Sequence, residues 1–70
     1  MTTAERVRKA VLSWEGVTVR DGHARLGRDD LGVLPTRMLV PWRVDRLIAR
    51  FRARYEQAAD LVDRRAGVLA

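Results

Sequence analysis

The sequence predicts an α+β fold: a short N-terminal helix, an antiparallel meander of two or three strands, and a long C-terminal amphipathic helix. Three patterns predict it, namely a helix-capping box near the N-terminus, an Asp-Gly pair between two alternating segments, and apolar residues at helical spacing after residue 41. The chain has 70 residues, of which 47% are hydrophobic, enough for one small core. We therefore expect residues 1–70 to form a single domain.

The first helix is expected over residues 3–14. Thr2 and Glu5 have the spacing of a capping box, in which each side chain accepts a hydrogen bond from the backbone N–H of the other residue. Apolar residues then recur on one arc of about 120°. They are Ala4, Val7, Ala10, Val11 and Trp14. Gly16 supplies the stop.

A β-hairpin is predicted over residues 17–26. Asp21-Gly22 is a pair that a type I′ turn favours, because both central residues of that turn need a positive φ. A two-residue turn also fixes the register and places the apolar residues on one face. The predicted opposite pairs are Val17 with Leu26, Thr18 with Arg25, Val19 with Ala24, and Arg20 with His23.

A second turn is expected at Gly27-Arg28-Asp29-Asp30, followed by a third short strand over residues 31–34 that Pro35 ends. Residues 36–40 leave two interpretations open. They form either an edge strand or a loop that packs on the core.

The C-terminal helix is predicted over residues 42–66. Pro41 suits its first turn, and Gly67 suits a left-handed residue just after its end. A helical projection separates this segment into an apolar, a basic and an acidic stripe. The apolar stripe comprises Val44, Leu47, Ile48, Phe51, Tyr55, Ala58, Ala59 and Val62. The basic stripe comprises Arg43, Arg46, Arg50, Arg54, Arg64 and Arg65, with Leu61 among them, and the acidic stripe Asp45, Glu56, Asp60 and Asp63.

Positive charge is concentrated on this helix. The chain has 14 Lys and Arg against 9 Asp and Glu, a net charge of +5, and residues 43–54 contain five of the arginines and one aspartate. Lys9 is the only lysine, and such arginine usage is typical of a high-GC bacterium or its phage. Composition alone is therefore weak evidence for a nucleic-acid partner, and the position of the arginines is the stronger evidence.

We expect Arg43, Arg46, Arg50 and Arg54 to contact the phosphate backbone of a nucleic acid. Guanidinium groups bind phosphate in a bidentate manner, and the row extends about 16 Å along the helix. Further candidates for this contact are Arg20, Arg25 and Arg28 in and beside the hairpin. Two alternatives remain open, namely arginines that only solvate one flank of the helix, and arginines that contact an acidic protein partner.

Self-association is also expected. A helix of about 35 Å is longer than a small meander covers, so part of its apolar stripe needs a partner, most simply in a homodimer. The interface candidates are Trp42, Phe51, Tyr55 and Leu61. The alternative function is an adaptor or assembly subunit that binds another protein through this helix and Trp42, with no role in nucleic-acid binding.

The sequence offers little chemistry for catalysis, and we expect a non-enzymatic protein without a cofactor, a metal or a small-molecule substrate. It has no Cys, and its single His23 and single Ser13 fall in separate predicted elements. Asp29 and Asp30 are more typical of a turn than of a metal site. No apolar run reaches the roughly 18 residues of a membrane helix, and the N-terminus is charged too early for a signal peptide. We therefore expect no membrane partner and a cytoplasmic location.

Two stretches resemble small actinobacterial domains known as luciferase family proteins. They are Trp14-Glu15-Gly16-Val17-Thr18, after a short amphipathic helix, and Arg25-Leu26-Gly27-Arg28-Asp29-Asp30-Leu31-Gly32. Leu47 to Tyr55 is similar to the last helix of those domains. That family has histidines just after the second glycine, where this chain has Val33-Leu34-Pro35. The resemblance implies a fold and no activity, so it transfers no site residue.

Overall fold

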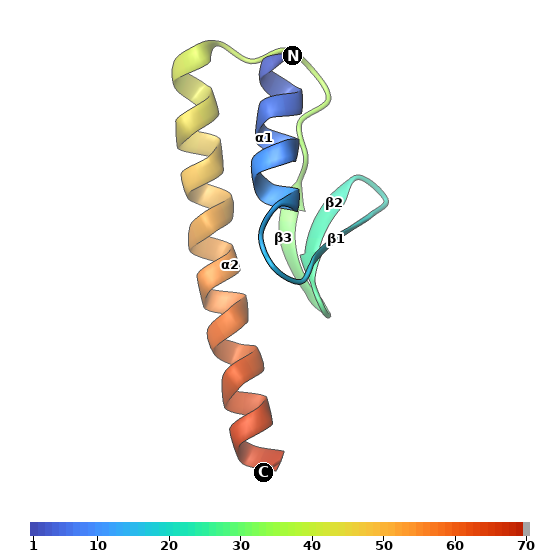
Figure 1. Cartoon of the computed structure of the whole chain (residues 1–70), viewed down its shortest axis with the longest axis vertical. Coiled ribbons are helices and arrows are strands. Elements are labelled where there is room, and N and C mark those ends of the chain that lie inside the picture. The colour runs from blue at the N-terminus through green and yellow to red at the C-terminus, as the bar shows by residue number, and fades with distance from the viewer. Residues whose placement is uncertain (70) are drawn as a thin grey trace.

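The computed structural model describes the backbone of residues 1–69 and the side chains of residues 1–65. In chain order the elements are α1 (Thr3–Leu12), β1 (Val17–Arg20), β2 (His23–Leu26), β3 (Asp29–Val33) and α2 (Pro41–Leu69). The two helices lie on the same side of the three-stranded meander (Figure 1). The strands form one antiparallel sheet in the order β1-β2-β3. The predicted α+β class and element order are confirmed. Within the described part of the chain, no helix is both long and apolar enough to cross a membrane.

Helix α1 begins at the predicted capping box. The Glu5 N–H donates to Thr2 Oγ1 at 3.1 Å, and the Thr2 N–H donates to Glu5 Oε2 at 3.4 Å. The helix ends at Leu12 rather than at residue 14. Ser13 Oγ donates to the Ala10 carbonyl at 2.6 Å, and this side-chain bond competes with continuation of the helix. Trp14 therefore leaves the helix and packs at its end.

The hairpin of β1 and β2 has the predicted register at all four residue pairs. Asp21 has φ +52° and Gly22 has φ +76°, so both central residues of the turn have the positive φ of a type I′ turn. Ala24 is fully buried, which places the apolar face of the hairpin toward the core.

Strand β3 differs from the prediction. It begins at Asp29, so the turn before it contains only Gly27 and Arg28, and Asp29 pairs with Leu26. The register then shifts: Arg25 pairs with Asp30 but Ala24 pairs with Gly32. Leu31 is therefore the extra residue of a β-bulge. The bulge allows consecutive residues 31 and 32 both to be buried, which strict alternation along a strand does not permit.

Residues 34–40 form a loop rather than an edge strand. Leu39 packs against the core, and its N–H donates to Thr3 Oγ1 at 2.6 Å, which joins the loop to the start of α1. Met38 and Val40, on either side of it, are exposed. Of the two interpretations left open by the sequence, the packed loop is confirmed.

Helix α2 begins at Pro41 and continues to Leu69, so the prediction that Gly67 ends it is wrong. A glycine inside a helix costs only about 1 kcal/mol relative to alanine and does not by itself terminate it. The principal dimensions of the molecule are 44 × 22 × 15 Å, and the longest is the length expected of α2. The C-terminal part of α2 projects beyond the sheet (Figure 1).

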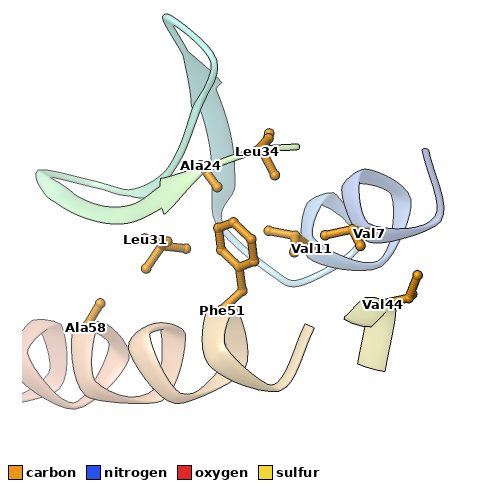
Figure 2. Close-up of a cluster of buried hydrophobic side chains, with 8 residues drawn as sticks. All are labelled: Val7, Val11, Ala24, Leu31, Leu34, Val44, Phe51 and Ala58. Carbon is orange, nitrogen blue, oxygen red and sulfur yellow. The ribbon is translucent and has the colours of Figure 1, made fainter. Parts of the chain in front are cut away.

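The core lies between α1, α2 and the inner face of the sheet. Figure 2 shows the Phe51 ring extending from α2 between Leu31 of β3 and Val11 of α1. Phe51 is 3% exposed, and Leu31 and Val11 are buried more completely still. The other members of this buried cluster are Val7, Ala24, Leu34, Val44 and Ala58. Phe51 is therefore a side chain through which α2 contacts both α1 and the sheet.

Substitution Phe51→Ala should remove most of the stability of the domain. Loss of a buried phenylalanine ring costs about 3–5 kcal/mol, against a total of about 4–10 kcal/mol for a domain of this size. Urea unfolding followed by circular dichroism measures the loss. Leu12→Ala, at a position that is 38% exposed, is the control and should cost less than about 1 kcal/mol. Equal losses for the two variants would contradict this assignment of the core.

Candidate functional site

Four arginines follow one side of α2 over its first half. Arg43, Arg46, Arg50 and Arg54 are separated by three, four and four residues, so they lie on one flank of the helix, and all four are exposed. Phe51 and Val44 on the neighbouring arc face the core, so this flank borders β3 and the loop of residues 34–40. The four arginines therefore share one exposed flank of α2, as their spacing predicts.

The arginines line a groove between α2 and the rest of the molecule. Its first section has a volume of about 320 Å³ and is lined by Leu39, Trp42, Arg43, Arg46, Leu47 and Arg50. Its second section has a volume of about 230 Å³ and is lined by Leu31, Gly32, Val33, Leu47, Arg50, Phe51 and Arg54. The two sections share Leu47 and Arg50 and are therefore adjacent, and together we call them the arginine groove. Cationic side chains and apolar side chains therefore line the same surface.

Arg54 is fixed in place by the bulge of β3. Its Nη1 donates to the carbonyl of Leu31, the extra residue of the bulge, at 3.2 Å. A Cβ atom on Gly32 would lie 2.8 Å from Arg54 Nη1 and 3.3 Å from Phe51 Cε1. Gly32 also has φ +125°, a conformation that other residues rarely adopt. Because residue 32 is a glycine, the side chains of Arg54 and Phe51 on α2 can approach the backbone of β3 this closely.

Gly32 and Leu31 are site residues that the sequence analysis did not identify. A signal was present, because a glycine inside a predicted strand often marks a bulge or a close backbone approach. The sequence analysis predicts a strand over residues 31–34 but predicts neither a bulge nor a close approach of α2 at Gly32.

Trp42 lies at the N-terminal end of the arginine groove. It is 60% exposed, and the guanidinium carbons of Arg43 and Arg46 lie 5.6 and 5.5 Å from its ring centroid. Such cation–π contacts are worth about 0.5–1 kcal/mol each at exposed sites, enough to favour one orientation of the indole. The sequence analysis placed Trp42 only among protein-interface candidates. Its spacing of four residues from Arg46 indicates a shared helix face.

The arginine row has no acidic counterpart in the described structure. Ion pairs join Arg52 to Glu56, Arg64 to Asp60, Arg65 to Asp29 and His23 to Asp30. Among residues 1–65, whose side chains are described, none of the four arginines of the row forms such a pair. Four exposed cations without such pairs make this flank of α2 a concentrated positive surface.

The three other candidate arginines lie elsewhere. In each strand, residues alternate between faces, and Ala24 points into the core, so Arg25 and its neighbour His23 lie on the outer face of the sheet. Arg20, opposite His23, lies there too. Arg28 is in the turn before Asp29, which pairs with Arg65 near the other end of α2. The structure does not bring these three residues together with the arginine groove.

The four interface candidates occupy different environments. Phe51 is a core residue, as described above. Tyr55 is half-buried, its hydroxyl donates to the Glu15 carbonyl at 2.8 Å, and its ring lies 5.3 Å from that of Trp14. Only Trp42 and Leu61 are exposed, and they lie in different halves of α2.

His23 and Asp30 form a small polar cluster on the outer face of the sheet. His23 Nδ1 lies 3.0 Å from Asp30 Oδ1, and the Gly32 N–H donates to the same oxygen at 3.2 Å. The hydrogen bond from Gly32, followed by the one to His23, lowers the pKa of Asp30 below its ordinary value. Over the described residues, no three acidic or histidine side chains gather into a cluster that could hold a metal ion.

Comparison with known proteins found no matching family model, no matching curated protein and no matching solved structure. The function therefore has to be inferred from the surface itself.

Asp30→Asn should change how stability depends on pH. A carboxylate whose pKa is lowered by folding stabilises the fold above its unfolded-state pKa, and this contribution disappears as the pH falls through the folded-state value. We therefore expect the variant to be less stable than the natural protein at pH 6 and the difference to shrink toward pH 2.5. Urea unfolding across this range measures it. Asp21→Asn, which also suits a type I′ turn, is the control for loss of one carboxylate elsewhere, in the turn of the hairpin.

Proposed function

We propose that this chain is a small non-enzymatic module that binds the backbone of a nucleic acid along the arginine groove. The observation that supports it best is the row of four exposed arginines, without acidic partners in the described structure, on one flank of α2. From Arg43 to Arg54 the helix rises about 16 Å, and each guanidinium presents paired donors suited to phosphate oxygens.

The distribution of the acidic residues supports a role beyond solubility. Glu56 and Asp60 pair with Arg52 and Arg64, which lie outside the row. Interspersed charges of both signs suffice to keep a surface soluble, whereas a large patch of one sign is suited to steering a charged ligand. The segregation of charge on α2 therefore favours a polyanionic ligand over simple solvation.

Binding should depend on the row and on salt. The double variant Arg46→Glu with Arg50→Glu should lose measurable affinity for a fluorescein-labelled oligonucleotide while retaining its circular dichroism spectrum. For the natural protein, four phosphate contacts predict a loss of affinity of roughly fifty- to a hundredfold between 50 and 200 mM salt. Fluorescence anisotropy measures both effects.

A matched control changes the same amount of charge elsewhere. Arg6 and Lys9 are exposed on α1, so Arg6→Glu with Lys9→Glu tests net charge without touching the arginine groove. This control should lose far less affinity than the groove variant. Equal losses from both variants would show that binding depends on net charge and not on the row.

We further propose that the chain forms a homodimer through the projecting part of α2. Leu61 and Val62 in this part are 43% and 42% exposed, although both are large apolar residues. The sheet does not extend along this part of the helix (Figure 1). A second copy packing on the same segment would bury these residues, and a chain this small gains stability from the added core.

Leu61→Asp should convert the dimer to a monomer without unfolding it. An aspartate buried in an apolar interface without a partner is strongly unfavourable, whereas at the surface of a monomer it is tolerated. Sedimentation velocity at tens of micromolar distinguishes the two species. Leu12→Asp, at a similarly exposed position on α1, is the control and should remain dimeric. A natural protein that sediments as a monomer would overturn the dimer proposal.

A further inference from the structure

We propose that the ligand of the arginine groove is a single-stranded nucleic acid, with one base stacked on Trp42 and the following phosphates on Arg46, Arg50 and Arg54. This inference rests on the proposed nucleic-acid function and specifies its substrate class. Three features support it, namely the exposure of Trp42, the apolar lining of the groove and the breadth of the molecule around α2.

Trp42 has the position of a stacking platform. A tryptophan that is 60% exposed gains little from the chain's own core, and its two guanidinium neighbours hold the indole at the end of the phosphate-binding row. Single-strand-binding proteins combine a positively charged groove with aromatic side chains on which bases stack. When a base covers the indole, the guanidinium groups of Arg43 and Arg46 are free to turn toward phosphate oxygens, so stacking and backbone binding support each other.

The lining of the groove suits unpaired bases. Leu39 of the loop and Leu47 of α2 are half-buried, and both line the groove. A duplex keeps the faces of its bases stacked inside and presents mainly phosphates and groove edges. A single strand has free base faces to place on these apolar side chains while its phosphates face the arginines.

The shape around α2 disfavours a duplex. A helix that reads duplex DNA enters the major groove, which is about 12 Å wide. The molecule measures 22 × 15 Å across its long axis, and β3 and the loop of residues 34–40 adjoin the flank that bears the arginines. The arginine groove is a corner between elements rather than a projecting ridge, so it accommodates an extended strand better than a double helix.

The test compares a twelve-nucleotide thymidine strand with a twelve-base-pair duplex, each labelled with fluorescein, at 50 mM salt. The natural protein should bind the single strand at least about tenfold more tightly than the duplex. Trp42→Ala should weaken single-strand binding by about five- to a hundred-and-fiftyfold, the range that loss of one stacked base predicts, and should reduce the preference for the single strand over the duplex. Trp42→Phe, which keeps an aromatic ring, should retain most of the affinity.

Intrinsic fluorescence provides a second measurement that does not require loss of the aromatic ring. The protein has two tryptophans, so Trp42→Phe leaves only the emission of Trp14. Stacking predicts that the single strand quenches the natural protein and that this quenching is absent in Trp42→Phe.

The outcomes separate this inference from the proposed function. Equal binding of strand and duplex, with no effect of Trp42→Ala, would overturn the single-strand inference and leave backbone binding intact. Failure of both oligonucleotides to bind at 50 mM salt would overturn the nucleic-acid function itself and favour an acidic protein as the partner. Single-strand preference that is lost in Trp42→Ala and kept in Trp42→Phe supports the inference.

Discussion

The packing of Phe51 across Gly32 determines how α2 is oriented, and much of the surface depends on it. The Phe51 ring occupies the space that a side chain at position 32 would need, with 3.3 Å between the hypothetical Cβ atom and Phe51 Cε1. Because a helix is rigid, Phe51 together with the buried residues Val44 and Ala58 fixes the direction of every other side chain on α2. Arg50 precedes Phe51 directly and Arg54 follows it by three residues, so both are placed at the border between helix and sheet. The position of the arginine groove is therefore a consequence of core packing.

Local patterns in the sequence predicted the parts of the fold that depend on neighbouring residues. The Thr2–Glu5 capping box and the register of the hairpin are encoded within a few residues, so no tertiary information is needed to predict them.

The start of β3 was missed because aspartate is uncommon in strands, and Asp30 is stabilised there by contacts with His23 and Gly32. The bulge at Leu31 follows from burial against α2, which is a tertiary constraint. The end of α2 was missed because Gly67 permits termination without requiring it.

The candidate site was predictable only in part, for a related reason. Helical spacing alone showed that Arg43, Arg46, Arg50 and Arg54 share a flank, and their exposure agrees with that prediction. The opposite wall of the groove comes from β3 and from Leu39, which only the folded topology brings beside α2. The predicted register already placed Arg20 and Arg25 on the outer face of the hairpin. The sequence did not show that α2 covers the inner face of the sheet. This packing separates Arg20 and Arg25, on the outer face, from the arginine row on α2.

Some arginines of this chain have partners that the fold itself supplies. Arg52 contacts Trp14 and Tyr55 at 5.2 and 5.0 Å and pairs with Glu56, while Arg54 donates to a backbone carbonyl. Each of these side chains has a partner supplied by the fold. Arg43 and Arg46 contact only Trp42 in this way, an aromatic ring that is itself exposed. Cations held beside an exposed aromatic ring, over an apolar groove, repel one another and leave their donors to solvent. A ligand that is both anionic and aromatic would satisfy the cations and the indole together, and a nucleotide strand has both properties in every repeat.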